Sequence, residues 1–247
     1  MQNSKLYKSV NINGELGDPC THACDLHCLL DFALSLSAKA LIRDTSHFPA
    51  IEHRVYEPGE HLFRRGDHTE FVVSIRSGLV KLVEFSSGGA ERIILLGSIG
   101  TAVGLRAILD EPMRHDAVAL RRTETCRIPI LLLKRLGECE PDVYLKLMFL
   151  WQKNLDFADQ NILSFSTGTV ISRVARLIMF MRDIEPNGKA QHFTLPNRED
   201  MAALLGVVPE SVCRAVAQLK RSKVLWKVKR DVYQCDWPSV EVLACLG

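Results

Sequence analysis

The feature that most constrains the fold of this chain is an abrupt change of pattern at Pro141. Between about Ile51 and Ile130, short apolar runs alternate with turns such as Ser77-Gly78 and Ser87-Gly88-Gly89. The segment that follows Pro141, PDVYLKLMFLWQKNLDFADQNILSF, contains no glycine and no internal proline, so it can form one long helix. A turn-rich β module followed by helices predicts an α+β fold with segregated strands and helices.

The β module is expected to span residues 46–140. Three apolar runs, FVVSI, LVKLVEF and RIILL, are bounded by turn residues, as is typical of an antiparallel β-roll or jelly roll. Leucines at helical spacing predict a short helix at about residues 29–41, within a separate amino-terminal segment of residues 1–45.

The long helix, predicted at residues 141–166, carries one continuous apolar stripe. Its members alternate in steps of four and three residues, which is the spacing of a coiled-coil seam. They are Tyr144, Met148, Trp151, Leu155, Ala158, Ile162 and Phe165. We therefore expect a homodimer with Met148, Trp151, Leu155, Ala158 and Ile162 at its interface, whereas Leu145, Leu147, Leu150 and Phe157 pack on the β module. The alternative is a helix that packs only on its own β module.

Residues 167–247 have the signals of a winged helix-turn-helix domain. A helix is predicted at about residues 170–182. Asn197 can cap the next helix, with Asp200 three residues on as in a capping box. Gly206 can end that helix, and Pro209 suits the first turn of a second one. The segment KVLWKVKRDVYQC then resembles a two-stranded wing.

The second helix of such a motif enters the DNA major groove with its first turns. This places Glu210, Ser211, Cys213 and Arg214 at base edges. Lys220, Arg221 and Lys223 are better placed for phosphates, which position a protein without specifying a sequence. Although the net charge is only +2, residues 211–230 include seven basic side chains and no acidic one.

Cysteines provide a candidate metal site. Cys20, Cys24 and Cys28 are evenly spaced in CTHACDLHC, and Cys126 follows in TETCRIPI. Four thiolates are the ligand set of an iron-sulfur cluster. His22 and His27 leave a zinc or mixed site open, and haem, a thiol switch or disulfides are further alternatives. Cys139, Cys235 and Cys245 are interpreted as ordinary small apolar residues.

Composition favours a cytoplasmic globular protein over other classes. The 247 residues are 47% hydrophobic, yet no apolar run reaches the ~18 residues that a membrane span needs. The polar start MQNSKLYKSVNINGELGD has no apolar core of an export signal. No nucleophile elbow, phosphate-binding glycine loop or metalloprotease motif is present, so an enzyme is not expected.

Over about residues 20–243 the chain resembles the FNR branch of the CRP/FNR family of bacterial transcription regulators. The motifs GEHLFRRGD, SIRSGLVK, VGLRAIL, TCRIPI and PESVCRAV carry this resemblance. It implies a β-roll like that of cyclic nucleotide-binding domains, and an oxygen-labile 4Fe-4S cluster on Cys20, Cys24, Cys28 and Cys126. It also implies an activator whose dimer binds promoter DNA while the cluster is intact, with RNA polymerase as a partner.

Two departures and one alternative accompany the resemblance. The family sets its first two cysteines closer together than this chain does, and Cys213 stands where the family has a serine. The CRP branch instead binds a small molecule, a cyclic nucleotide, through a glutamate and an arginine. Arg106 and Asp116 lie where that pair is expected, with the charges reversed, and Arg114 is a further candidate.

Overall fold

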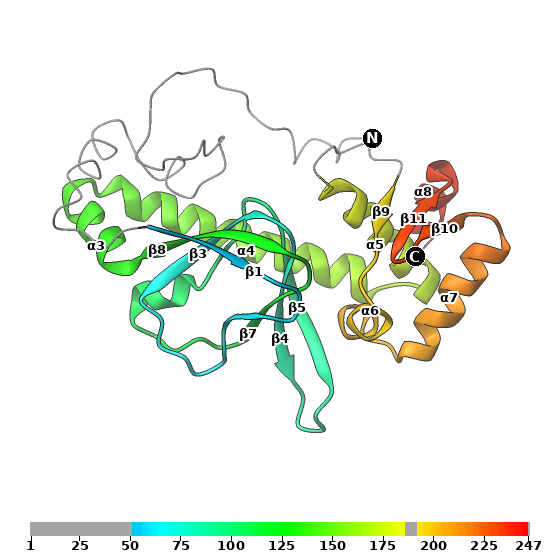
Figure 1. Cartoon of the computed structure of the whole chain (residues 1–247), viewed down its shortest axis with the longest axis horizontal. Helices are drawn as coiled ribbons and strands as arrows, with labels where there is room; N and C mark the ends of the chain where they lie inside the picture. The colour runs from blue at the N-terminus through cyan, green and yellow to red at the C-terminus, as the bar shows by residue number, and fades with distance from the viewer. Residues whose placement is uncertain (1–50, 186–191, 247) are drawn as a thin grey trace, which may run out of the picture.

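The computed structural model describes residues 51–185 and 192–246, which form two modules joined by one long helix (Figure 1). The helix expected at residues 29–41 and the cysteines Cys20, Cys24 and Cys28 lie outside the described residues. The observed architecture is an antiparallel β module followed by helices and a small winged domain, which confirms the predicted α+β fold.

The β module consists of two four-stranded antiparallel sheets, in the orders β1-β8-β3-β6 and β2-β7-β4-β5. Its strands are β1 (Glu52–Tyr56), β2 (His61–Phe63), β3 (Phe71–Ser77), β4 (Val80–Phe85), β5 (Glu91–Gly97), β6 (Ala102–Val103), β7 (Asp116–Ala119) and β8 (Thr123–Pro129). The apolar runs FVVSI, LVKLVEF and RIILL fall in β3, β4 and β5, as predicted. A short 3-10 helix, η2 (Leu105–Leu109), lies between β6 and β7.

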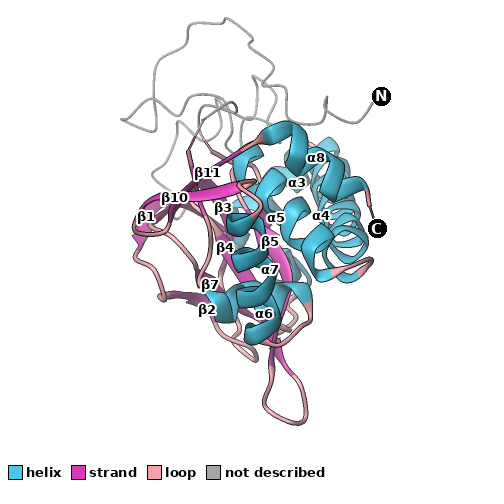
Figure 2. Cartoon of the chain, turned by 90° about the vertical axis from the view of Figure 1, so that its right-hand side faces the viewer, coloured by secondary structure: helices cyan, strands magenta, loops and turns pink. Residues whose placement is uncertain are grey.

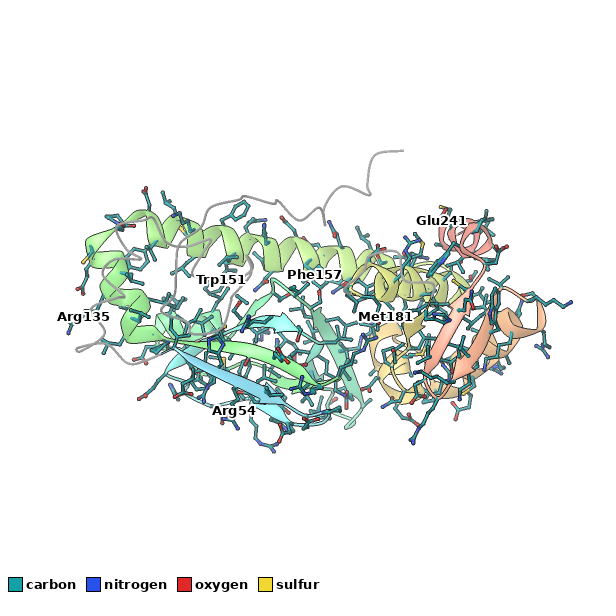
Figure 3. The ribbon with its side chains drawn as sticks, turned by 45° about the horizontal axis from the view of Figure 1, so that its top comes forward. Arg54, Arg135, Trp151, Phe157, Met181 and Glu241 are labelled. Atoms are coloured by element: carbon teal, nitrogen blue, oxygen red, sulfur yellow. The ribbon has the colours of Figure 1, made fainter. Side chains whose placement is uncertain are left out.

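Helix α3 (Ile130–Cys139) leads into the long helix α4 (Asp142–Ser166), which runs along the β module (Figure 3). Leu147 and Leu150 are buried, as expected for residues that pack on that module. The ring centroid of Phe157 lies 5.8 Å from that of Phe180 in the next helix. The expectation for Leu145 was wrong, because 65% of it is exposed to solvent.

The carboxy-terminal module contains helices α5 (Val170–Asp183), α6 (Arg198–Leu205), α7 (Pro209–Arg221) and α8 (Trp237–Cys245). A three-stranded sheet in the order β10-β11-β9 accompanies them, made of β9 (Phe193–Thr194), β10 (Leu225–Lys229) and β11 (Val232–Cys235). Figure 2 shows two of these strands, β10 and β11. Within the described ranges no single helix is long and apolar enough to cross a membrane, and only the pair α6 and α7, bent by 105°, passes that test jointly.

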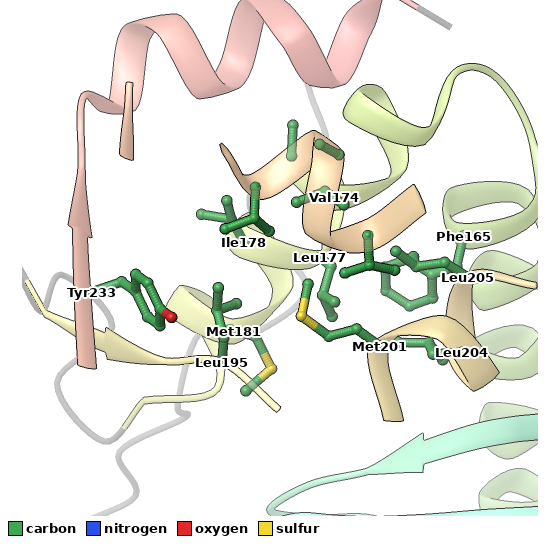
Figure 4. Packing of buried hydrophobic residues seen from close by; sticks show 14 of the residues in the cluster. Phe165, Val174, Leu177, Ile178, Met181, Leu195, Met201, Leu204, Leu205 and Tyr233 are labelled. Carbon is green, nitrogen blue, oxygen red and sulfur yellow. The ribbon is translucent and has the colours of Figure 1, made fainter. Parts of the chain in front are cut away.

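The two modules share one hydrophobic core. Figure 4 shows the part of this core between Phe165 and Tyr233. Leu79, Val83, Ile93 and Leu96 of the β4–β5 region belong to the same buried cluster as the side chains of α5, α6 and α7. Phe165, near the end of α4, is also buried there, and for this reason it is unavailable to an intermolecular seam. The β module therefore contacts the carboxy-terminal module directly as well as through α4.

Candidate nucleic-acid interface and thiol site

The helix-turn-helix forms at the residues that the sequence indicates. The side-chain oxygen of Asn197 accepts a hydrogen bond of 2.7 Å from the backbone N–H of Asp200 at the start of α6. Gly206 ends α6 with φ +64°, a left-handed conformation that glycine adopts without strain. Pro209 occupies the first turn of α7, which crosses α6 at 105°. These local signals orient α7 as the second helix of the motif.

Helix α7 is amphipathic, with one apolar face and one polar face. Val212, Ala215, Val216 and Leu219 are buried against the rest of the domain. On the other face, Glu210, Cys213 and Arg214 are exposed, and Arg214 Nη2 donates a 3.1 Å hydrogen bond to Ser211 Oγ. The residues predicted to contact base edges therefore lie together on the solvent side of α7.

A basic surface continues from α7 onto the wing formed by β10 and β11. All seven basic side chains that the sequence indicates in this region are exposed: Arg214, Lys220, Arg221, Lys223, Lys227, Lys229 and Arg230. Lys220 Nζ lies 5.3 Å from the ring centroid of Tyr233, so it is held beside the wing. Such a surface suits the phosphates of a nucleic acid.

The aromatic residues of the wing serve packing rather than base stacking. Tyr233 is buried and its ring stacks on that of Phe193, with centroids 6.4 Å apart. Trp226 is 41% exposed, but its Nε1 donates a 3.1 Å hydrogen bond across the two strands to Gln234 Oε1. Both side chains are therefore engaged in contacts within the wing domain.

Cys126 is the one predicted cluster ligand that lies within the described residues. It is fully buried in β8, and its register partners are His53 in β1 and Ser74 in β3. Its Sγ lies 3.5 Å from His53 Nδ1, and the same nitrogen lies 3.3 Å from Arg76 Nη1. No group of three or more potential metal-ligating side chains occurs within residues 51–185 and 192–246.

Cys126 also belongs to the hydrophobic cluster that fixes α4. Leu147 and Leu150 are members of this cluster, and Trp151 packs against it. The thiol is thus in the same packed region as the side of α4 that contacts the β module.

The other described cysteines differ in environment. Burial raises the pKa of Cys235 to about 12, so this thiol stays protonated at neutral pH, as expected of a small apolar residue. Cys139 and Cys245, which the sequence also indicates as ordinary small apolar residues, are exposed. Cys213 is exposed on α7.

Arg106 and Asp116, the pair considered for binding a cyclic nucleotide, form hydrogen bonds within the β module. Arg106 Nη2 donates to Glu111 Oε2 at 3.0 Å, and its Nε donates to the carbonyl of Pro112. Asp116 Oδ1 accepts a 2.6 Å hydrogen bond from the backbone N–H of Arg65. Arg106, the cation of the two, is thus engaged by local partners, and the Asp116 carboxylate is bound to a backbone N–H.

Comparison with known proteins gives matches in both modules. Residues 53–137 match the family model "Cyclic nucleotide-binding domain", and residues 172–241 match "Crp-like helix-turn-helix domain". The chain is 30% identical to the transcriptional activator protein FnrA of Stutzerimonas stutzeri over 78% of its length and 80% of the relative's. It is 29% identical to the transcriptional activator protein anr of Pseudomonas aeruginosa over the same shares of both chains.

Solved structures agree with this fold. The structure of FixK2 from Bradyrhizobium japonicum superposes with a TM-score of 0.69 at 22% identity, covering 81% of this chain and all of FixK2. A CRP-family transcriptional regulator from Thermus thermophilus gives a TM-score of 0.67 at 19% identity, over 77% of this chain and 96% of that one.

A β-roll joined by a long helix to a winged helix-turn-helix defines a DNA-binding transcription regulator. The chain belongs to the FNR branch of the CRP/FNR family, as the sequence motifs predict.

Proposed function

We propose that this protein is a cytoplasmic transcription activator that senses oxygen or another oxidant and binds promoter DNA as a homodimer. In this proposal Cys20, Cys24, Cys28 and Cys126 hold a 4Fe-4S cluster. The relatives named FnrA and anr support the assignment to a transcriptional activator. The observation that carries the sensing proposal is the position of Cys126 in the packed cluster that also contains Leu147 and Leu150 of α4.

The chemistry of Cys126 fits the proposed cofactor. A cysteine thiolate is the donor that iron-sulfur clusters take from proteins, and Cys126 offers its Sγ from β8, 3.5 Å from His53 Nδ1. When bound, the cluster would supply an inorganic centre that oxidants degrade. The role of Cys126 is to couple the ligand site to α4 through shared packing.

The opposite side of α4 supports the proposed dimer. Met148, Leu155 and Ile162 of the predicted seam are each more than half exposed, and Leu163 extends the same apolar face. Trp151 and Ala158, the remaining members of the predicted interface, are half-buried against their own chain and would lie at its edge. In the proposed dimer, one face of α4 packs on its own β module and another on the second copy of the protein. Loss of the cluster would therefore be transmitted through α4 to the dimer interface.

DNA recognition then follows from two-fold symmetry. Two copies of α7 would enter successive major grooves about 34 Å apart. Arg214 would contact guanine and Glu210 the exocyclic amine of cytosine, with Ser211 and Cys213 beside them. Lys220, Arg221 and Lys223 would bind phosphates, and RNA polymerase would be recruited to the bound dimer.

A Cys126→Ser variant tests the sensing proposal. We expect protein purified without air to be brown, with about four irons per subunit. Cys126→Ser should lose most of this iron, sediment as a monomer and bind promoter DNA weakly. Cys139→Ser removes the exposed thiol at the end of α3 and is the matched control, which should keep the iron and the dimer.

Iron, zinc and sedimentation measurements separate the alternatives. If the purified protein contained zinc instead of iron, the cysteines would form a structural metal site and not a redox sensor. Metal-free, colourless protein that still binds DNA as a dimer would contradict cluster-controlled dimerisation and favour a thiol switch or a small-molecule sensor.

A further inference from the structure

An ion-paired lysine connects the β module to the helix-turn-helix. Lys81 Nζ of β4 lies 2.5 Å from Glu91 Oε1 of β5 and 2.5 Å from Asp200 Oδ1 of α6. The side chains of Lys81 and Asp200 are only 12% and 10% exposed. Because salt and water reach this pair poorly, it is screened much less than a surface ion pair.

Asp200 is committed to this contact. The expected capping arrangement at α6 is made by Asn197, whose side chain accepts from the Asp200 backbone N–H. The carboxylate of Asp200 points instead to Lys81. Burial lowers the pKa of Lys81, but the hydrogen bonds to Asp200 and Glu91 outweigh this effect and raise it, so the ammonium remains charged at neutral pH.

A second contact lies beside the first. Arg92 of β5 donates through Nη1 to the carbonyl of Ala203 in α6 at 3.3 Å, and through Nη2 to Ser166 Oγ at the end of α4 at 3.2 Å. One guanidinium therefore links β5, α4 and the first helix of the motif. Together with the apolar contacts of Ile93 and Leu96, these bonds fix the orientation of α6, and α7 packs on α6.

We infer that Lys81, Asp200 and Arg92 are positioning residues that hold the helix-turn-helix at one angle to α4 and so make the protein selective for one spacing between DNA half-sites. This inference rests on the dimeric DNA binding proposed above. In a dimer joined through α4, the distance between the two α7 helices depends on how rigidly each motif is fixed to its own α4. Loosening this joint broadens the range of spacings that the dimer accepts.

The test uses the full-length protein and promoter DNAs whose two half-sites are separated by different numbers of base pairs. The variants are Lys81→Met and Asp200→Asn, with Lys81→Arg as the conservative replacement. Glu84→Gln is the matched control, since Glu84 lies on the same strand, β4, and its 3.7 Å ion pair with Arg65 is on the surface.

We expect the wild type, Lys81→Arg and Glu84→Gln to bind one spacing far better than its neighbours. In Lys81→Met and Asp200→Asn this preference should fall about tenfold, because removing one partner leaves a buried charge or weakens its pair. Hydrogen exchange of the α6 amides, measured without DNA, should be about tenfold faster in these two variants, as expected for a local opening.

The outcomes separate the two proposals. Equal loss of affinity at every spacing, or unchanged spacing profiles, would overturn the positioning role even if the variants were less stable. If the wild type bound no spaced half-sites, the proposed DNA-binding dimer would fail, and the exchange rates of α6 would still decide whether Lys81 and Asp200 hold the joint. Unchanged exchange in both variants would refute that role.

Discussion

At the scale of single residues, Gly78 has the strictest steric requirement in the β module. Its φ is +98°, and a Cβ there would lie 2.6 Å from both the carbonyl oxygen of Arg122 and the Cα of Thr123. Because these are backbone atoms, no side-chain rotation relieves the contact. We expect Gly78→Ala to lower the free energy of unfolding by about 2–4 kcal/mol, measured by urea denaturation.

Gly89→Ala is the matched control for this substitution. Gly89 also has a positive φ, of +79°, but a Cβ would meet nothing within 4 Å. It should therefore lose only the conformational term of about 1 kcal/mol. Equal losses in the two variants would contradict the steric explanation for Gly78.

At the scale of elements, we propose two roles for the polar residues of α7 and of the turn that follows it. Arg214→Ala should relax the preference for one guanine and lose about 1–3 kcal/mol of discrimination, as a lost bidentate contact does. Lys223→Ala should weaken binding to all sequences alike and lower the salt slope by about one. Fluorescence anisotropy on a set of half-site variants, repeated at several salt concentrations, measures both effects. Equal, sequence-independent losses would contradict the assigned roles.

Elements with strong local signals could be predicted from the sequence. Asn197, Gly206 and Pro209 act within a few residues of their own position, so both ends of α6 and the start of α7 follow from them. The uninterrupted run after Pro141 likewise predicts α4. Strand β9 has only two residues and depends on pairing with β11, so no periodic pattern indicates it. Helix α8 was missed, although Asp236 followed by a proline at position 238 is a recognisable start.

Long-range contacts could not be predicted in this way. Lys81 and Asp200 are 119 residues apart, and each has an ordinary local explanation, as a strand residue and as part of a capping box. Leu145 was misplaced for a similar reason, because periodicity shows that α4 has two apolar faces but does not decide which residues lie at their borders. For the candidate thiol site, the spacing of the cysteines indicates ligands, and only the fold places Cys126 beside α4.

At the scale of the whole molecule, the exposed face of α4 is the proposed dimer interface. Ile162 is 59% exposed in the single chain, and burying such a side chain stabilises an interface by about 1.5–3 kcal/mol. We expect Ile162→Glu to shift the protein toward monomer in sedimentation velocity. Val242→Glu, at a residue of α8 that is 61% exposed, is the matched control and should leave the association unchanged. Similar behaviour of the two variants would place the interface elsewhere.

The core that the two modules share bears on how such regulators diversify. Ile93 and Leu96 of β5 belong to the same buried cluster as Met201 and Leu205. The carboxy-terminal module therefore cannot be fused to another β module without losing these contacts. A chimera with a relative would have to exchange the β4–β5 hairpin together with the helix-turn-helix domain. Substitutions in the two modules are therefore expected to be correlated where the modules contact each other. Among the described residues, the solvent face of α7 has no such contacts, so its residues can change independently.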